Sequence, residues 1–448
     1  MNVFFESIGC RLNQSEIEKL AHQFRADGYT IVKTLAEADL IVINTCAVTN
    51  AAASDSRQKI RQAARVGHAK IAATGCWVTL EPSRVSEMEQ VKWVVPNLEK
   101  DNLAAIVLGK NFTDYDLEPM TRDPLPGTPT RTRAFVKVQD GCDNHCTFCV
   151  TRLARGAGRS VNIHSVLSDV RGYVMGGAKE VVLSGAHLGS WGKDLTPRLH
   201  LSHLVDAILA DTDVERLRLS SLEPWALDES LCRLLLNPRV CSHLHLPLQS
   251  GCAETLKRMA RNTTPNDFAH RIQKARSYAP DMAITTDLIV GFPGETEDEF
   301  ESSLDFVRSM EFAGGHVFSY SVRPGTAAAR MKSQVKGDVV RHRSQQMRVD
   351  LEKSARDYRR GFLGCEAIVL WEATDRRGPQ GWCLHGLTDT YIRVEAYFGQ
   401  LLRNQMSKVR LVGLTENGMS GKLLESPSEW EDLKSDVLSQ QGEINKCQ

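Results

Sequence analysis

Short apolar runs alternate with helical patterns along the first 112 residues. The runs VFFES, LIVIN and KIAAT are rich in β-branched or aromatic residues, as is typical of buried strands. This alternation predicts a small parallel α/β domain over residues 1–112. The helical patterns that follow the three runs lie at about 14–27, 51–66 and 82–89.

A second block of strand and helix patterns covers residues 134–362. Residues 113–133 separate it from the first block and contain four prolines and few apolar residues, which predicts a linker. Six strand–helix units predict a partial, open (βα)6 version of the (βα)8 barrel, with its chemistry at the carboxyl ends of the strands. The six strand-like runs are AFVKVQ, EVVLSG, RLRLSS, HLHLPL, AITTDLIV and GHVFSY.

The pattern changes again over residues 363–425, where short strands are separated by Gly, Pro and Asn. The runs EAIVLWEA, GWCLHG, TYIRVEA and SKVRLVGLT predict a compact, five-stranded, OB-like all-β barrel, a fold that often binds nucleic acid. Residues 426–448 are polar and are expected to form a tail. The predicted fold class is therefore α/β with a small all-β barrel at the end.

Composition is that of an ordinary globular protein, with 42% hydrophobic and 25% charged residues among 448. No window is long and apolar enough for a membrane helix, and the first residues do not resemble a secretory signal, so we expect a cytoplasmic protein with no membrane partner. Twelve cysteines in such a protein favour reduced thiols and metal ligands over a disulfide scaffold.

The formal net charge is zero, which neither supports nor excludes a nucleic-acid partner, because a binding surface can be local. Arg152, Arg155 and Arg159 make the segment after residue 150 locally basic. Such residues could contact phosphates. Internal salt bridges are the alternative for Arg155 and Arg159.

Three closely spaced cysteines, Cys142, Cys146 and Cys149, carry the strongest chemical signal. Their C-x3-C-x2-C spacing leaves a tetrahedral zinc site incomplete, whereas three thiolates suit a [4Fe–4S] cluster with one iron left open. The spacing resembles the signature of the radical S-adenosylmethionine (SAM) enzymes.

A second set of cysteines lies in the predicted N-terminal domain. Cys10, Cys46 and Cys76 each follow one of its three strand-like runs. Because the carboxyl ends of parallel strands share one edge of a sheet, the three sulfurs are expected to converge there. Gly9 and Gly75 would allow the backbone to approach a bulky group closely. Ordinary buried cysteines are the alternative.

Four segments, GCRLNQSE, INTCAVTNAA, TGCW and QDGCDNHCTFCVTRLARGAGRS, together resemble the methylthiotransferase family. The resemblance extends from about residue 3 to residue 424. Within the family, GCRLNQSE and CTFCVTRLARGAGRS are most similar to the branch that acts on N6-threonylcarbamoyladenosine at tRNA position 37.

The resemblance implies two [4Fe–4S] clusters with different tasks. Cys142, Cys146 and Cys149 would hold the cluster that reduces SAM and generates a 5′-deoxyadenosyl radical. Cys10, Cys46 and Cys76 would hold an auxiliary cluster that carries the sulfur to be inserted. One SAM would methylate that sulfur, and a second would supply the radical that activates C2 of the adenosine. All six cysteines are therefore expected catalytic and metal-binding residues.

The same resemblance assigns SAM contacts to residues of five motifs. Phe148 matches an aromatic position beside the cluster or the adenine of SAM. The other assigned contacts fall at ends of the barrel strands, where they would approach the methionine and ribose groups: Ser184, Gly185, Ser220, Glu223, His245, Gln249 and Asp287.

The C-terminal barrel resembles a TRAM domain, which is found on RNA-modifying enzymes. The implied partner is the anticodon loop of tRNA, in which adenosine 37 is unpaired and can enter a pocket. An electron donor such as flavodoxin or ferredoxin and a source of sulfur are also implied.

Other hypotheses remain open at this point. The substrate could be isopentenyl-adenosine 37 or a ribosomal protein. The chain could also be a radical SAM methyltransferase that inserts no sulfur and has structural N-terminal cysteines, or an RNA-binding protein with an inert cluster. The N-terminal cysteines argue against the methyltransferase, and the intact SAM motifs argue against the inert protein.

Overall fold

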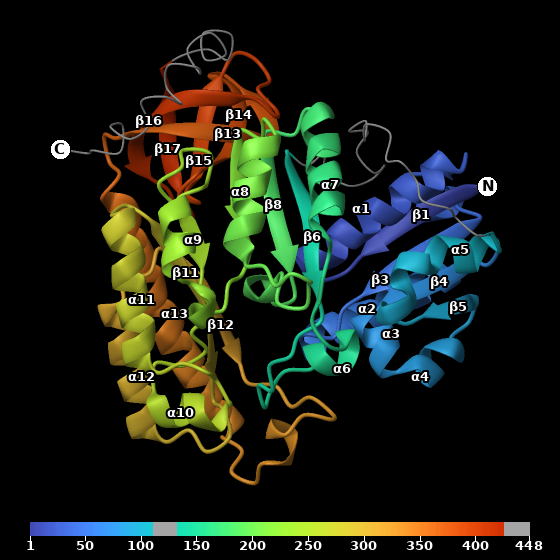
Figure 1. Ribbon diagram of the computed structural model, residues 1–448, viewed down its shortest axis with the longest axis horizontal. Coiled ribbons are helices and arrows are strands. Elements are labelled where there is room, and N and C mark those ends of the chain that lie inside the picture. Colours follow the sequence, from blue (N-terminus) through green and yellow to red (C-terminus); the bar gives the residue numbers. More distant parts are fainter. Residues whose placement is uncertain (111–131, 425–448) are drawn as a thin grey trace.

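The computed structural model describes residues 1–110 and 132–424. Within them lie a parallel N-terminal sheet, an open parallel barrel and a closed barrel whose last and third strands pair in parallel, shown from blue to red in Figure 1. The predicted tail lies outside the described residues, as does the predicted linker except for its last two residues. No helix of the described part is both long and apolar enough to cross a membrane.

The N-terminal sheet is parallel throughout and has the strand order β2-β1-β3-β4-β5. All six residues of β3 are buried because the sheet is covered on both faces. Ile41 and Ile43 face one apolar cluster, and Leu40 and Val42 face another. The elements are β1 (Asn2–Ser7), α1 (Arg11–Ala26), β2 (Thr30–Ile31), η1 (Leu35–Glu37), β3 (Leu40–Thr45), α2 (Asn50–Ala64), β4 (Lys70–Gly75), α3 (Cys76–Leu80), α4 (Pro82–Ser86), β5 (Val91–Val95), η2 (Asn97–Asn102) and α5 (Leu103–Leu108).

The central sheet confirms the predicted open barrel. It is built from two ladders, β7-β6-β8-β9 and β10-β11-β12, in which only β7 runs antiparallel to its neighbour. A parallel bridge between Ser221 and His245 joins the two ladders into six parallel strands. The strands are β6 (Arg133–Asp140), β7 (Arg159–Ser160), β8 (Glu180–Gly185), β9 (Arg216–Leu219), β10 (His243–His245), β11 (Ala283–Val290) and β12 (Gly314–Ser319).

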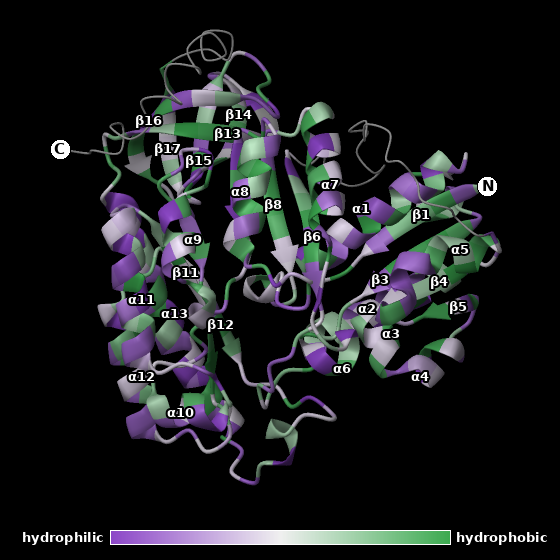
Figure 2. Cartoon of the chain, viewed as in Figure 1, coloured by the Kyte–Doolittle hydropathy of each residue, from purple (hydrophilic) through white to green (hydrophobic). Residues whose placement is uncertain are grey.

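Helices cover the outer side of this open barrel. Their apolar faces and the outward-facing strand residues form the largest core of the protein, and the hydrophobic strands are seen in green in Figure 2. The helices are α6 (Thr151–Arg155), α7 (Ile163–Met175), η3 (Leu188–Ser190), α8 (Leu201–Asp211), η4 (Pro224–Ala226), α9 (Glu229–Leu234), α10 (Ala253–Arg258), α11 (Pro265–Tyr278), α12 (Glu297–Ser309), η5 (Ala328–Arg330) and α13 (Gly337–Arg360).

The C-terminal segment forms a closed barrel with the strand order β13-β14-β15-β17-β16, as predicted. Its core contains the fully buried Trp371, whose indole nitrogen donates a hydrogen bond to Oγ of Ser407 at 3.1 Å. The strands are β13 (Glu366–Gly378), β14 (Gly381–Thr388), β15 (Arg393–Phe398), β16 (Met406–Leu414) and β17 (Met419–Leu423).

Buried ion pairing attaches this barrel to the amino-terminal end of the central sheet. Arg218 bonds Glu180 through Nε at 2.7 Å and the carbonyl oxygens of Thr388 and Asp389 at 3.1 and 2.8 Å. Burial alone would raise the pKa of Glu180, but Arg218 and its neighbours outweigh it and lower that pKa to about 2. The barrel thus lies opposite the catalytic end predicted for the strands.

Tyr391, in the turn between β14 and β15, contacts the other two parts of the protein. Its ring stacks on His243 of β10, with ring centroids 4.3 Å apart. Its hydroxyl accepts a hydrogen bond from Arg11 of α1. The three structural units therefore meet at one side chain.

Candidate functional site

The cysteine loop between β6 and α6 is held by backbone hydrogen bonds to distant segments. The amide of Cys142 donates to the carbonyl of Gly156 at 3.1 Å, and the amide of Thr147 donates to Met259 at 3.0 Å. A tight turn joins the amide of Cys149 to the carbonyl of Cys146 at 3.1 Å. The three thiols are partly exposed and form no disulfide. The loop therefore presents three available sulfurs at the carboxyl end of β6.

The electrostatics of this loop suit a bound cationic group. Burial raises the pKa of Cys142 to about 11, and Cys149, Glu223 and Cys146 act in the same direction. Deprotonating all three thiols would thus require a compensating positive charge, which the irons of a cluster supply. Nη1 of Arg261 already lies 3.7 Å from the sulfur of Cys146.

The spacing of the sulfurs points away from a single metal ion. Among residues of the described ranges, just one group of three possible ligands has all its ligand atoms within 4.8 Å of one another, and it contains neither cysteine triad. A cluster of several irons separates its thiolates more widely than one ion does. As they stand, the sulfurs of neither triad are spaced for a single ion, and a cluster on each triad stays a prediction.

Phe148, between two of these cysteines, packs edge-on against Phe292, with centroids 6.4 Å apart. Phe292 belongs to the turn GFPGE after β11, and both rings border a small cluster with Met259 and Ala328. The contact ties the cysteine loop to that turn. A role of Phe148 beside SAM stays a prediction.

The predicted polar residues lie in one row across neighbouring strands. Ser184 and Gly185 end β8, and Ser220 directly follows β9, where its amide bonds the carbonyl of Leu183 at 3.0 Å. His245 ends β10. The structure therefore brings these motifs together, although they are far apart in the sequence.

The row continues through His245 to Asp287. Nε2 of His245 lies 3.2 Å from Oδ2 of Asp287, which lies inside β11 and not at its end as expected. Gln249 has a positive φ of 74° and pairs with β11 through its backbone, with its amide 2.8 Å from the carbonyl of Asp287. The backbone of Gln249 thus has a structural role, and a side-chain contact to SAM stays a prediction.

Several polar atoms in this row have no partner within the described part of the chain. They are Oγ of Ser184, Oγ of Ser220 and Oδ1 of Asp287, all buried from solvent. Because a buried polar atom without a hydrogen bond is costly, such atoms indicate a place where a polar ligand is expected to bind. These atoms are available to a polar ligand, and their contact with SAM stays a prediction.

Replacing Ser220 by alanine should weaken SAM binding by about tenfold, the effect of one lost hydrogen bond. The unfolding temperature should stay the same or rise, because an unpaired buried hydroxyl is removed. The matched control is Ser407→Ala, which leaves the indole of Trp371 without its acceptor and should lower stability but not SAM affinity. Calorimetric titration and thermal unfolding measure both effects, and unchanged affinity in Ser220→Ala would contradict the assignment.

Glu223 connects the row of strand ends to the cysteine loop. Its Oε2 accepts a hydrogen bond from Nη2 of Arg261 at 2.6 Å, and Arg261 also donates to the carbonyl of Pro247 at 2.8 Å. The ring of Trp225 lies 4.7 Å from the guanidinium carbon. Sequence reasoning missed Arg261, which follows α10 outside every quoted motif and has no local signal of its own.

The N-terminal cysteines converge as expected. Cys10 directly precedes α1, Cys46 follows β3, and Cys76 follows β4 as the first residue of α3. Burial, together with the nearby thiols of Cys10 and Cys76, raises the pKa of Cys46 to about 11. Cys46 and Cys76 are buried, whereas Cys10 is exposed, and none forms a disulfide. The three thiols thus share one electrostatic environment at one sheet edge.

Gly9 allows the first two cysteines of this triad to approach each other. It has a φ of +97°, and a Cβ atom there would lie 2.5 Å from the sulfur of Cys46. A real Cβ contact is never that short, so any larger residue would displace the Cys46 side chain. Glycine is therefore required both by the backbone and by the sulfur.

We expect Gly9→Ala to displace Cys46 and to lower the iron content of the reconstituted protein from about eight to about four atoms per chain. Gly28→Ala is the matched control, since Gly28 has a similar φ of +83° but no atom within 4 Å of the added Cβ. Its cost is only the backbone strain of about 1 kcal/mol. Colorimetric iron analysis measures the iron content of both variants. Equal iron loss in Gly9→Ala and Gly28→Ala would contradict the role of Gly9 in positioning Cys46.

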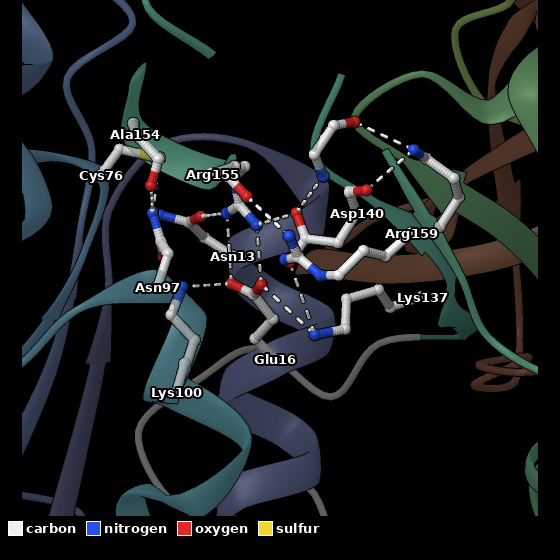
Figure 3. Close-up of polar contacts among 12 residues, drawn as sticks. Asn13, Glu16, Cys76, Asn97, Lys100, Lys137, Asp140, Ala154, Arg155 and Arg159 are labelled. Carbon is white, nitrogen blue, oxygen red and sulfur yellow. Dashed lines mark hydrogen bonds and ion pairs between the residues drawn. The ribbon is translucent and has the colours of Figure 1, made fainter. Parts of the chain in front are cut away.

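A buried network of ions joins the two cysteine-bearing parts (Figure 3). Arg155, in the helix after Cys149, bonds Oε1 of Glu16 and Oδ1 of Asp140, both at 2.8 Å, and Oδ1 of Asn13 at 2.7 Å. Glu16 and Asn13 belong to α1, which begins right after Cys10. Asp140 stands two residues before Cys142. One guanidinium thus links the segments that carry both triads.

Lys100 completes the network from the side of the N-terminal sheet. Its ammonium group lies 2.7 Å from Oε2 of Glu16, and both side chains are 2% exposed. Burial alone would raise the pKa of Glu16, but Lys100 and Arg155 outweigh it and hold that pKa well below its usual value. Asn97 adds a further link, donating to the sulfur of Cys76 at 3.5 Å and to the carbonyl of Ala154 at 2.8 Å.

This network corrects one expectation from the sequence. Arg155 was a candidate for contacting phosphates, but it is buried among Glu16, Asp140 and Asn13 and cannot reach RNA. Arg159 lies 3.7 Å from Asp140 and remains partly exposed. Arg152 is exposed and bonds the carbonyl of Asp143 at 3.2 Å. Of the three arginines, Arg152 and Arg159 keep access to solvent.

Comparison with known proteins identifies the two parts that carry cysteines. The model described as "Uncharacterized protein family UPF0004" matches residues 2–96, and that of the Radical SAM superfamily matches residues 136–307. Membership of the second implies SAM and one [4Fe–4S] cluster. A solved radical SAM methyltransferase, TsrM from Kitasatospora setae, has the same fold with a TM-score of 0.57 at 15% identity, covering 73% of this chain and 75% of its own.

Curated relatives cover nearly the whole chain. The threonylcarbamoyladenosine tRNA methylthiotransferase of Bacillus subtilis is 33% identical, and the match covers 88% of this chain and 89% of the relative. The enzyme of the same name from Thermotoga maritima is 34% identical, and that match covers 93% of this chain and 96% of the relative. The tRNA-2-methylthio-N(6)-dimethylallyladenosine synthase of Caldicellulosiruptor saccharolyticus is 34% identical, and the match covers 81% of this chain and 80% of the relative. The chain therefore belongs to the radical SAM methylthiotransferase family.

Proposed function

We propose that this protein inserts a methylthio group at C2 of N6-threonylcarbamoyladenosine 37 in tRNA. The observation that carries the proposal is the pair of cysteine triads joined through Arg155, in a chain that matches threonylcarbamoyladenosine tRNA methylthiotransferases along most of its length. A radical SAM methyltransferase would need only the triad of the central barrel. The second triad supports sulfur insertion.

Each triad would hold its own [4Fe–4S] cluster. Cys142, Cys146 and Cys149 would bind the cluster of the radical SAM superfamily, and Cys10, Cys46 and Cys76 an auxiliary cluster. When bound, the clusters and SAM supply the electron, the sulfur, the methyl group and the radical that the unactivated C2–H bond requires.

The side chains of the protein would position these groups and screen them from solvent. The row from Ser184 to Asp287 offers unpaired polar atoms to SAM. Arg261 holds Glu223 beside the cysteine loop and donates toward Cys146. The network of Arg155, Glu16 and Lys100 fixes the relative position of the two triads, since a packed ion network resists small displacements.

The RNA and protein partners follow from the same proposal. An anticodon loop can present adenosine 37 as a flipped base. Arg152 and Arg159 remain accessible near the cysteine loop for its phosphates. The barrel docks at the other end of the central strands, so a tRNA that contacts both would extend along the protein. A flavodoxin or ferredoxin would deliver electrons, and a separate sulfur source would act in the cytoplasm.

Isopentenyl-type adenosine is the second candidate substrate, because the dimethylallyladenosine synthase is as similar to this chain as the threonylcarbamoyladenosine enzymes are. Mass spectrometry of tRNA nucleosides from cells lacking the gene separates the two. We expect loss of 2-methylthio-N6-threonylcarbamoyladenosine and accumulation of its precursor without sulfur. Loss of the 2-methylthio-isopentenyl nucleoside instead would establish the second candidate, and an unchanged profile would reject both.

A further inference from the structure

Three potential metal ligands lie together on the outside of the C-terminal barrel. Cys383 and His385 are two residues apart on β14, and Glu395 on β15 pairs directly with His385. Leu384, between the first two, is buried in the barrel core. Because side chains alternate between the faces of a strand, Cys383, His385 and Glu395 all point outward. They lie in the runs GWCLHG and TYIRVEA, for which the sequence pattern predicts only strands.

The distances among the three ligand atoms suit a tetrahedral ion. The sulfur of Cys383 lies 3.6 Å from Nε2 of His385 and 3.5 Å from Oε1 of Glu395. All three atoms lie within 4.8 Å of one another. Tetrahedral zinc, with Zn–S of about 2.3 Å and Zn–N or Zn–O of about 2.0–2.1 Å, separates sulfur from the lighter ligands by about 3.5–3.6 Å. The two distances from the sulfur of Cys383 therefore match those of a tetrahedral zinc site.

We propose that Cys383, His385 and Glu395 bind one Zn²⁺ ion. A thiolate, an imidazole and a carboxylate together are a donor set for zinc, whereas magnesium and calcium prefer oxygen alone and iron–sulfur clusters use mainly thiolates. All three residues are half-buried, so an ion from solvent can reach them. The site is separate from both cysteine triads and shares no ligand with them.

The position of the site gives the ion a structural effect. It joins β14 to β15, the hairpin whose turn carries Tyr391. Tyr391 in turn contacts His243 of the central barrel and Arg11 of the N-terminal unit. A metal that fastens the two strands together stiffens the hairpin through which the three units meet.

The test uses the full-length protein with both triads loaded with iron, because empty triads could themselves take up zinc. We expect about one zinc per chain by elemental analysis at full iron content. Zinc X-ray absorption should show one sulfur at about 2.3 Å with nitrogen or oxygen at about 2.0–2.1 Å. No bound zinc at full iron load, or a first shell of sulfur alone, would overturn the proposal.

Variants test the ligands individually. Cys383→Ser and Glu395→Gln should each weaken zinc binding by about a hundredfold or more in competition with a fluorescent chelator, since a ligand is lost. Cys252→Ser is the matched control: this cysteine precedes α10 at its N-cap position, where serine is favourable, and zinc affinity should not change. Equal zinc affinity in Cys383→Ser and the unmodified protein would also overturn the proposal.

Discussion

Replacing Cys10, Cys46 and Cys76 together by alanine is expected to halve the iron load, from about eight to about four atoms per chain, and to abolish methylthio transfer. Reductive cleavage of SAM should continue. The cysteine loop of the central barrel is held by Gly156 and Met259, and those contacts do not involve the N-terminal cysteines. Loss of the N-terminal triad should therefore leave the SAM cleavage of the other triad intact.

The matched control replaces cysteines that are buried but belong to neither triad. Cys232→Ala with Cys252→Ala should keep the full iron load and both activities. The reciprocal change of Cys142, Cys146 and Cys149 should instead abolish SAM cleavage. Iron analysis and chromatography of 5′-deoxyadenosine measure these outcomes. A full iron load without the N-terminal cysteines would disprove the auxiliary cluster.

Replacing Arg155 by methionine is expected to cost about 3–5 kcal/mol, as does the loss of one partner from a buried ion pair. Glu16 and Asp140 would lose a bond of 2.8 Å each, and Asn13 one of 2.7 Å. Glu16 is 2% exposed and cannot turn to water. The segments that carry the two triads should then separate more easily.

Arg159→Met is the control for Arg155→Met, because Arg159 pairs with the same Asp140 but its side chain is 42% exposed. An exposed pair contributes less than about 1 kcal/mol, so the control should unfold almost like the unmodified protein. Thermal unfolding and limited proteolysis between the N-terminal and central parts measure the difference. Equal stability of the two variants would contradict the bridging role of Arg155.

Much of the fold could be predicted from the sequence because its buried strands are strongly apolar. The open barrel and the C-terminal barrel were predicted correctly as classes. Four short, edge or polar strands were missed: β2, β5, β7 and β17. β5 is partly exposed, and β17, with the sequence MSGKL, has little apolar character, so neither shows the pattern of a buried strand.

Site residues could be predicted from the sequence only where they form a local motif or follow predicted strands. The spacing of Cys142, Cys146 and Cys149 is local, and the second triad followed from the rule that parallel strands end at one edge. Arg155 was partly misjudged, because a basic run in a sequence does not reveal which of its members face buried carboxylates. Arg261 and the ligands on β14 and β15 depend on tertiary contacts, for which one sequence contains no signal.

The most direct measurement is the product of the reconstituted protein acting on tRNA that carries N6-threonylcarbamoyladenosine, with SAM and a reductant, analysed as nucleosides by mass spectrometry. We predict 2-methylthio-N6-threonylcarbamoyladenosine from the unmodified protein. The variant without Cys10, Cys46 and Cys76 should give none, although it still cleaves SAM. A nucleoside that gains a methyl group without sulfur, or the methylthio product formed without the N-terminal cysteines, would contradict the account.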